Sequence, residues 1–243
     1  MDAEARPFLV IGHRGAAGHE PENTLRSFRR ALELGADGLE LDVRLSADGE
    51  LVVFHDAALQ RVTDGRGPLV RCTLAQLRAC DAGKGERIPT LREVFELVDR
   101  RALINIELKA RGTARPVEAL IGEFIAQRGW APEHFLVSSF LRGELALLRD
   151  PRVRRGVLFT RPGLGWTTLA RRLDAWSVHP RARWTGARFV RAAQQRGWRV
   201  IPFTVNDPAE LARLRLIGVD GVFTDFPDRV RAATGLFARG GML

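Results

Sequence analysis

The feature that most constrains this chain is a regular alternation of short apolar segments with amphipathic ones. Between the apolar segments, hydrophobic residues recur at helical spacing, as in Leu91, Val94, Phe95 and Val98. Eight segments have the composition of buried parallel β-strands, and they cover residues 8–11, 38–43, 103–109, 135–139, 156–159, 175–178, 199–205 and 221–224. Strands that alternate with helices at this count predict a closed (β/α)8 TIM barrel, with an open, doubly wound sheet as the alternative.

Two departures from the simple repeat follow the second strand. Asp48-Gly49 predicts a hairpin turn, after which residues 51–54 return antiparallel and end at His55. This pairing is expected to bring His55 alongside Asp42. Residues 56–88, which contain several glycines, then form a small insertion over the carboxyl ends of the strands. We predict one domain over 1–243, with this insertion inside it.

Side chains able to do chemistry gather at the ends of the first three parallel strands. Active sites of (β/α)8 barrels lie at the carboxyl ends of the strands, so these side chains should meet. The i, i+2 spacing within the second and third strands places each pair on one face, which in a barrel is the interior. The residues are His13, Arg14, Glu40, Asp42, His55, Glu107 and Lys109.

The residue types in this set predict chemistry on a phosphate ester. Glu40, Asp42 and Glu107 are hard oxygen ligands suited to one divalent metal ion, Mg²⁺ or Ca²⁺. Without a metal, three clustered carboxylates repel one another, and at least one should take up a proton. The two histidines suit general acid and base roles, and the two cations suit charge stabilisation on phosphoryl oxygens.

Each motif taken alone also has a structural interpretation. A strand-end histidine can be structural, Glu40 and Asp42 can face solvent, and Glu107 with Lys109 can form an ordinary ion pair. Asn23 or Thr24 can cap the following helix. The joint occurrence at successive strand ends favours the functional interpretation. Of the other histidines, His19 and His134 are expected in loops, and His179 is a weaker candidate for the barrel mouth.

The charge distribution bears on possible partners. The formal net charge is +9, and the basic excess lies in the second half of the chain. Such an excess attracts anionic small molecules, lipids or nucleic acid. The arginines are scattered with few aromatic residues between them, which argues against a nucleic-acid groove. We therefore expect a small-molecule substrate and no nucleic-acid partner, and the sequence leaves the oligomeric state open.

Location is the other property on which composition bears. No run approaches the ~20 apolar residues that span a bilayer, so stable membrane insertion is not expected. The first residues lack a basic and then apolar signal-peptide pattern. Cys72 and Cys80 form neither a metal-type pair nor a disulfide framework. The expected location is the cytoplasm.

The ordered motifs resemble those of the glycerophosphodiester phosphodiesterases. The similarity covers nearly the whole chain and involves the motifs His13-Arg14-Gly15, Pro21-Glu22-Asn23-Thr24, Glu40-x-Asp42, His55-Asp56, Arg61–Gly67, Glu107-x-Lys109, Val137–Phe140, Phe203–Asn206 and Gly218–Asp225. Two positions depart from the family pattern. Phe203 stands where the family often has tryptophan, and Val62 where it often has threonine.

The resemblance implies a TIM-barrel hydrolase that releases an alcohol and sn-glycerol 3-phosphate. It assigns Glu40, Asp42 and Glu107 to a divalent metal, and His13 and His55 to acid and base. It assigns phosphate contact to Arg14 and Lys109, places Phe203 in the pocket wall, and suggests a cyclic phosphate intermediate. The alternatives are a phospholipase or lyase of the same superfamily acting on membrane phospholipids, and a non-catalytic barrel that binds a phosphate ligand.

Overall fold

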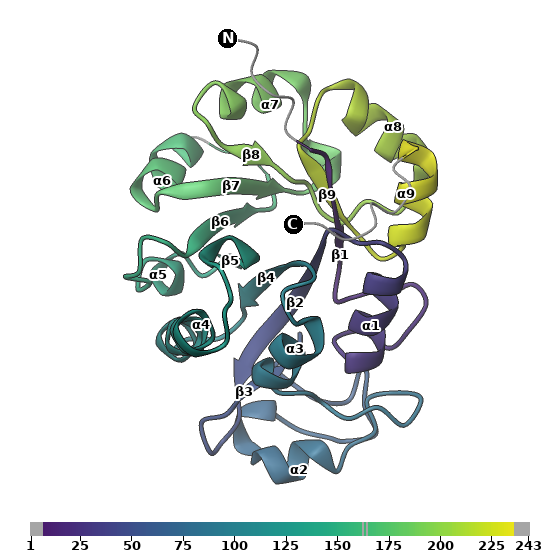
Figure 1. Ribbon diagram of the computed structural model, residues 1–243, viewed down its shortest axis with the longest axis vertical. Coiled ribbons are helices and arrows are strands. Elements are labelled where there is room, and N and C mark those ends of the chain that lie inside the picture. The colour runs from purple at the N-terminus through teal and green to yellow at the C-terminus, as the bar shows by residue number, and fades with distance from the viewer. Residues whose placement is uncertain (1–6, 162, 164, 236–243) are drawn as a thin grey trace.

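The computed structural model describes residues 7–161, 163 and 165–235, and these form a barrel of parallel strands ringed by helices (Figure 1). The strands are β1 Leu9–Gly12, β2 Gly38–Leu45, β3 Leu51–Val53, β4 Leu103–Leu108, β5 Phe135–Ser139, β6 Arg154–Phe159, β7 Ala175–Pro180, β8 Arg199–Val200 and β9 Gly221–Thr224. The helices are α1 Leu25–Glu33, α2 Leu74–Arg78, α3 Leu91–Val98, α4 Ala114–Gln127, α5 Arg142–Leu145, α6 Trp166–Arg172, α7 Ala187–Gln194, α8 Pro208–Leu216 and α9 Pro227–Thr234, with short 3₁₀ turns at Leu69–Arg71, Pro132–His134 and Ala182–Trp184.

The strand order confirms the predicted barrel. Neighbouring strands run β8-β7-β6-β5-β4-β2-β1-β9, and β3 pairs with β2 outside this path. Backbone hydrogen bonds close the ring between the last two strands: the amides of Asp220 and Phe223 donate to the carbonyls of Val200 and Pro202 at 2.9 and 3.0 Å. The amide of Val205 also donates to the carbonyl of Phe223 at 2.8 Å. An open doubly wound sheet would lack this closure.

Two elements of the barrel are short. The expected strand over 199–205 is regular only at Arg199–Val200, because Pro202 has no amide proton to donate to the ladder. Its later residues still bond to both neighbouring strands. Helix α5, at Arg142–Leu145, is also short, since it begins without a side-chain cap and has Gly143 in its first turn.

Side chains alternate in direction along each strand, so the barrel has two separate apolar cores. Outward residues such as Leu41 and Ile106 pack against the helices in the main hydrophobic cluster. Inward residues form a smaller apolar cluster that includes Ile11, Leu103 and Leu136. Along β4 the inward positions read Leu103, Asn105 and Glu107, so the barrel interior changes from apolar at its floor to charged at its mouth.

The insertion lies beside the barrel, near α1 and α3 (Figure 1). Its apolar residues pack with β3 in a separate small cluster that includes Phe54, Leu59 and Leu77. The antiparallel register pairs Val43 with Val53, as the predicted hairpin requires. The guanidinium of Arg44 then donates two hydrogen bonds to the carbonyl of His55, at 2.9 and 2.7 Å, and this fixes the histidine at the end of the hairpin.

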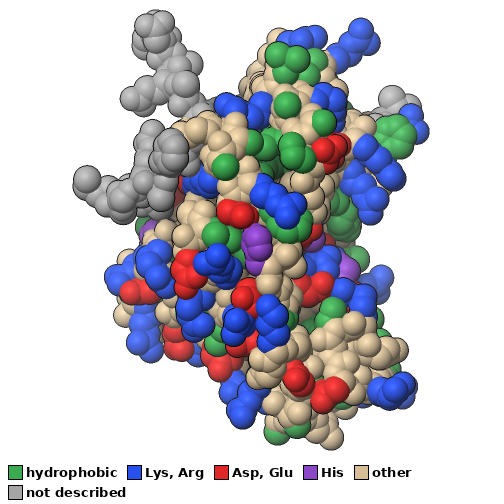
Figure 2. Space-filling view, turned by 90° about the vertical axis from the view of Figure 1, so that its right-hand side faces the viewer, with side chains coloured by type: hydrophobic (Ala, Val, Ile, Leu, Met, Phe, Trp, Pro, Cys, Tyr) green, Lys and Arg blue, Asp and Glu red, His purple; other side chains and the backbone are tan. Residues whose placement is uncertain are grey.

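Surface charge is dispersed on the face that Figure 2 shows, where Lys and Arg side chains are interspersed with Asp and Glu. Within the part of the chain that the structure describes, none of the helices is both long and apolar enough to cross a bilayer.

Candidate active site

Three buried carboxylates form the centre of the site, as the sequence predicts. Glu40 and Asp42 lie on β2 and Glu107 on β4, and their side chains come from paired strands, with Asp42 opposite Glu107. The residues are 4%, 1% and 8% exposed. One oxygen from each lies within 4.8 Å of the other two. The spacing of a metal-ligand set is therefore present, contributed by rigid strands.

The electrostatics of this cluster fit a divalent cation. Burial, and then the charges of Asp42 and Glu107, raise the pKa of Glu40 to about 8. Burial and the Asp42 charge also raise the pKa of Glu107. Both shifts persist although Lys109 Nζ lies 2.8 Å from Glu107 Oε1 and 3.6 Å from Asp42 Oδ1. The negative charge is under-compensated, so the residues present fit a bound metal ion.

His13 is held at the tip of β1 by the last strand of the barrel. Its amide donates to the carbonyl of Thr224 at 2.8 Å, and its Nδ1 lies 2.7 Å from Asp225 Oδ1. Burial raises the pKa of Asp225, but the hydrogen bond and charge of His13 outweigh this, so the pKa is lowered. An ionised carboxylate only accepts, so Nδ1 carries the proton and Nε2 is left for proton exchange.

His55 is held by its neighbour in sequence. Its Nδ1 lies 2.5 Å from Asp56 Oδ1, so this ring is also oriented through Nδ1. The two rings differ in acidity. For His13, burial lowers the pKa, but the Asp225 hydrogen bond and the Glu40 charge more than offset it, and the pKa is raised. For His55, burial outweighs the opposing effects of Asp42 and Asp56, and the pKa is lowered.

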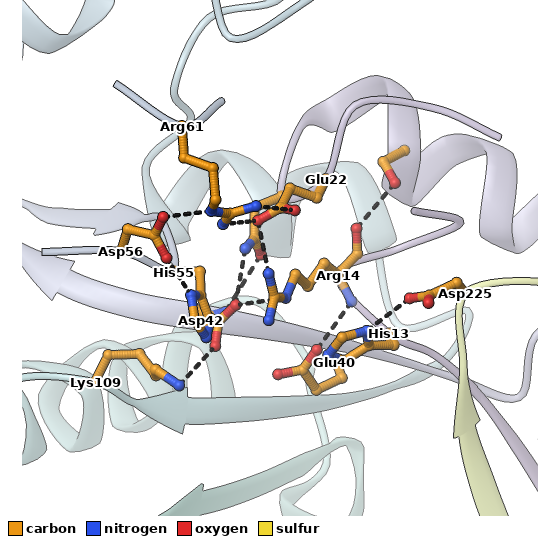
Figure 3. Close-up of polar contacts among 12 residues, drawn as sticks. His13, Arg14, Glu22, Glu40, Asp42, His55, Asp56, Arg61, Lys109 and Asp225 are labelled. Atoms are coloured by element: carbon orange, nitrogen blue, oxygen red, sulfur yellow. Dashed lines mark hydrogen bonds and ion pairs between the residues drawn. The ribbon is translucent and has the colours of Figure 1, made fainter. Parts of the chain in front are cut away.

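A chain of charged contacts joins His55 to Arg14 through the insertion (Figure 3). Arg61 pairs through Nε with Asp56 and donates through Nη1 and Nη2 to both oxygens of Glu22, at 2.9 and 2.7 Å. Glu22 Oε1 also accepts from Arg14 Nη1 at 2.7 Å. The insertion therefore orients both His55 and Arg14.

Arg14 is positioned by its backbone as well as by its side chain. Its φ of +50° is in the left-handed region, which non-glycine residues rarely adopt. Its amide donates to Glu40 Oε2 at 2.9 Å, and its Nε lies 3.4 Å from Asp42 Oδ2. Ser27 of α1 donates to the carbonyl of Arg14 at 2.9 Å. Strain at this residue is thus compensated by contacts from β2 and α1.

Asn23 has a role that the capping interpretation missed. Thr24 caps α1, accepting from the amide of Ser27, whereas the buried Asn23 donates from Nδ2 to Asp42 Oδ2 at 2.9 Å. Of the two caps that the sequence left open, Thr24 is the one observed. Asn23 instead orients a carboxylate of the cluster.

Six of the eight predicted site residues line one pocket of about 410 Å³, and the other two, Glu40 and Asp42, lie outside its lining. Its lining includes both histidines, both predicted cations, Glu107 and Phe203. Glu40 lies below, beside a second cavity of only about 20 Å³ that also touches His13 and His179. His179 is fully buried, with Nε2 2.7 Å from Ser177 Oγ, and burial lowers its pKa to about 3. It therefore lies inside the barrel and not at the mouth.

Several residues of the site were absent from the predicted set although their motifs were visible. Asp225, Asp56, Glu22 and Arg61 hold the histidines and Arg14 in place. Each lies in a segment carrying the family resemblance, but a carboxylate beside a histidine in space leaves no spacing signal when 212 residues separate them. His19 lies in a turn against Asp228, and His134 ends a 3₁₀ turn.

Two cations and two histidines at the strand ends, beside three buried carboxylates, form a site typical of a barrel hydrolase of phosphate esters. The model of the glycerophosphoryl diester phosphodiesterase family matches residues 13–229, and the chain belongs to this family. The family and enzyme class predicted from the sequence motifs are thus confirmed.

Relatives and solved structures agree with this assignment. Glycerophosphodiester phosphodiesterase of Caldanaerobacter subterraneus is 38% identical over 231 residues, covering 90% of this chain and 95% of the relative. The enzyme of Bacillus altitudinis is 38% identical over 244 residues, with 90% and 95% coverage. A phosphodiesterase of Oleispira antarctica, solved in complex with its product sn-glycerol-3-phosphate, superposes with a TM-score of 0.86 at 34% identity, covering 93% of this chain and 96% of that one.

Proposed function

We propose that the protein hydrolyses glycerophosphodiesters to an alcohol and sn-glycerol 3-phosphate, in a metal-dependent reaction with His13 and His55 as the acid–base pair. The observation that carries the proposal is the buried Glu40, Asp42 and Glu107 cluster beside two histidines, each oriented by its own aspartate. The product named for the Oleispira antarctica structure supports this substrate class. Mg²⁺ or Ca²⁺ is the ion expected from an all-oxygen set.

In this proposal the residues of the chain bind the phosphate and move two protons. Arg14 and Lys109 line the pocket and contact the phosphoryl oxygens. One histidine Nε2 accepts the proton of the glycerol 2-hydroxyl as its oxygen attacks phosphorus. The other donates a proton to the departing alcohol oxygen as its bond to phosphorus breaks. Water then opens the cyclic phosphate, with the proton transfers reversed. A metal ion bound to the three carboxylates would supply charge stabilisation to the phosphoryl group.

The test is hydrolysis of glycerophosphocholine by the purified protein, with glycerol 3-phosphate and choline both measured. Metal-replete protein should release the two in equal amounts, and EDTA should stop the reaction, with Mg²⁺ or Ca²⁺ restoring it. Turnover that survives complete chelation contradicts metal dependence. Accumulation of a cyclic phosphate without glycerol 3-phosphate, or activity confined to phospholipid vesicles, favours the lyase or phospholipase alternative.

Three further assignments complete the proposal. Residues 1–243 form one domain, since the family match runs from residue 13, just after β1, to residue 229 in α9. Two separately stable fragments in limited proteolysis would contradict this. The protein works in the cytoplasm, consistent with the free thiols of Cys72 and Cys80, and cell fractionation tests this. The pocket takes a small molecule and no nucleic acid, which a salt-dependent DNA-binding assay would contradict.

A further inference from the structure

The side of the pocket away from the carboxylates has a different chemistry, which the proposed proton transfers do not use. Its lining includes Arg181 and Arg183 from the turn after β7, Phe140 from the turn after β5, and Phe203 and Glu210. We call Arg181 and Arg183 the arginine rim. A glycerophosphodiester reaches beyond its scissile phosphate in two directions, toward the glycerol and toward the alcohol, so this rim can contact the substrate.

The backbone carrying the arginine rim is fixed by the scaffold. The amide of Ala182 donates to the carbonyl of Phe203 at 2.8 Å, and the amide of Trp184 donates to the carbonyl of Arg181 at 3.0 Å. From α8, the guanidinium of Arg213 donates to the carbonyls of Ala182 and Thr185, at 2.9 and 2.8 Å. The turn is therefore held from two sides, and the two arginine side chains project from a preorganised base.

The charge balance of this side is positive. Among the described residues, neither rim arginine belongs to an ion pair, while the nearby carboxylate of Glu210 lies 3.6 Å from Arg213. The guanidinium of Arg183 lies 5.6 Å from the centre of the Trp184 ring, and that of Arg161 lies 4.7 Å from the same ring. Arginines stacked on an aromatic ring keep their charge and their donors available for an anion.

An apolar wall completes this side. Phe140 and Phe203 meet edge to face, with ring centres 5.9 Å apart, and Phe140 is 41% exposed. Such a wall can pack against the carbon atoms of an alcohol while a charged end reaches the arginine rim.

We infer that the arginine rim is a leaving-group subsite, which favours glycerophosphodiesters whose alcohol carries a carboxylate or a phosphate. The inference rests on the proposed function. The glycerol moiety is uncharged, so a second anion on the substrate can come only from the alcohol. A cationic alcohol such as choline or ethanolamine would instead meet two like charges. The preference among alcohols is thus set by residues that take no part in the proton transfers.

The test compares esters that share glycerol 3-phosphate and differ in the alcohol. The cationic probe has ethanolamine as its alcohol, and the neutral probe has glycerol. The carboxylate probe has 3-hydroxypropionate as its alcohol, and the phosphate probe has glycerol phosphate. We expect kcat/KM to be about tenfold higher for the anionic probes than for the ethanolamine ester at low salt. This ratio should fall as salt is added, because the rim is exposed.

Removing the rim should abolish the preference. In an Arg181→Gln, Arg183→Gln double variant the selectivity ratio should fall to about one. Arg188→Gln is the matched control, since it removes the same charge from an exposed position on the neighbouring α7, outside the pocket lining, and should leave the ratio unchanged. A double variant that retains the wild-type ratio, or a wild-type protein that prefers the cationic ester, overturns the inference.

Binding separates this inference from the proposed function. If the wild-type protein turns over none of the probes, the proposed function fails, while the subsite is still decided by calorimetric titration of the intact probes into a His13→Ala variant. Tighter binding of the anionic probes that disappears with the rim arginines supports the subsite. Equal dissociation constants for anionic and cationic probes overturn it.

Discussion

The two sides of the barrel mouth are built in different ways. On the side of β1, β2 and β4, the charged residues lie on the strands or immediately at their ends, and they are buried or half-buried and joined to one another (Figure 3). On the side of β5 to β8, the charged residues lie on turns beyond the strands and are exposed. Positions on strands cannot move without disturbing the barrel, whereas turns can change sequence freely. This difference is consistent with the two proposals above, in which the first side performs the chemistry and the second selects the substrate.

Replacing His13 should have the largest effect and tests the role of the first side directly. His13→Ala is expected to lower kcat by about 10²–10⁴-fold, the usual contribution of a positioned acid or base. His134→Ala is the matched control, because that histidine caps a 3₁₀ turn outside the pocket lining. Steady-state assays of glycerol 3-phosphate release measure both, and a His13→Ala enzyme within tenfold of wild type would end the assigned role.

The carboxylate cluster is expected to destabilise the metal-free protein while serving the reaction, and Glu40→Gln tests this. In metal-free protein, folding raises the pKa of Glu40 from 4.5 to about 8, because of burial and the Asp42 charge. Between these pH values the folded state binds more protons than the unfolded state, so stability falls as pH rises. Metal-free Glu40→Gln should melt at least ~3 °C above wild type at pH 8 but not at pH 4.

The same substitution should lower activity in the presence of metal, by at least about 100-fold. Added Mg²⁺ or Ca²⁺ should raise the melting temperature of wild type at pH 8 more than that of Glu40→Gln, because only wild type relieves carboxylate repulsion by binding the ion. Thermal melts at both pH values and with both ions check this. Equal melting temperatures of the two metal-free proteins at pH 8 would refute the repulsion.

Arg61 tests whether the insertion contributes to the first side. Arg61→Gln should lower kcat about tenfold, since it releases Asp56 and Glu22, which orient His55 and Arg14. Arg66→Gln, an exposed change in the same segment, is the control. A structural role alone predicts a lower melting temperature with kcat preserved. Partial recovery of kcat in Arg61→Lys is expected if charge as well as geometry matters.

Replacing Phe203 is expected to have the smallest effect, and it tests the role of the second side in substrate binding. Phe203→Leu removes the edge-to-face contact with Phe140, a contact worth about 0.5–1.5 kcal/mol. KM should therefore rise about two- to tenfold with kcat nearly unchanged. A double-mutant cycle with Phe140→Leu should show that the two changes are not additive. A kcat that falls as steeply as in His13→Ala would place Phe203 among the reacting groups and erase the distinction between the sides.

Residues on strands were predictable because their periodicity carries spatial information. The spacing of Glu40 with Asp42 and of Glu107 with Lys109 fixes a face, and the hairpin signal at Asp48-Gly49 fixes the place of His55. Contacts between distant segments leave no such pattern. The pairing of His13 with Asp225 and of Arg61 with Glu22 depends on barrel closure and on the path of the insertion. His179 illustrates the same limit, since strand position alone does not say how deep in the barrel a side chain lies.

The contact between His13 and the last strand has a consequence for how the protein becomes active during its synthesis. The backbone of His13 is held by Thr224 and its ring by Asp225, which leaves the ribosome 212 residues after the histidine, on the order of 10–40 s later at ordinary rates of translation. A nascent chain that ends before β9 has its three clustered carboxylates but lacks both of these contacts to His13. We therefore expect hydrolysis to begin only once β9 has joined the barrel and both contacts to His13 have formed.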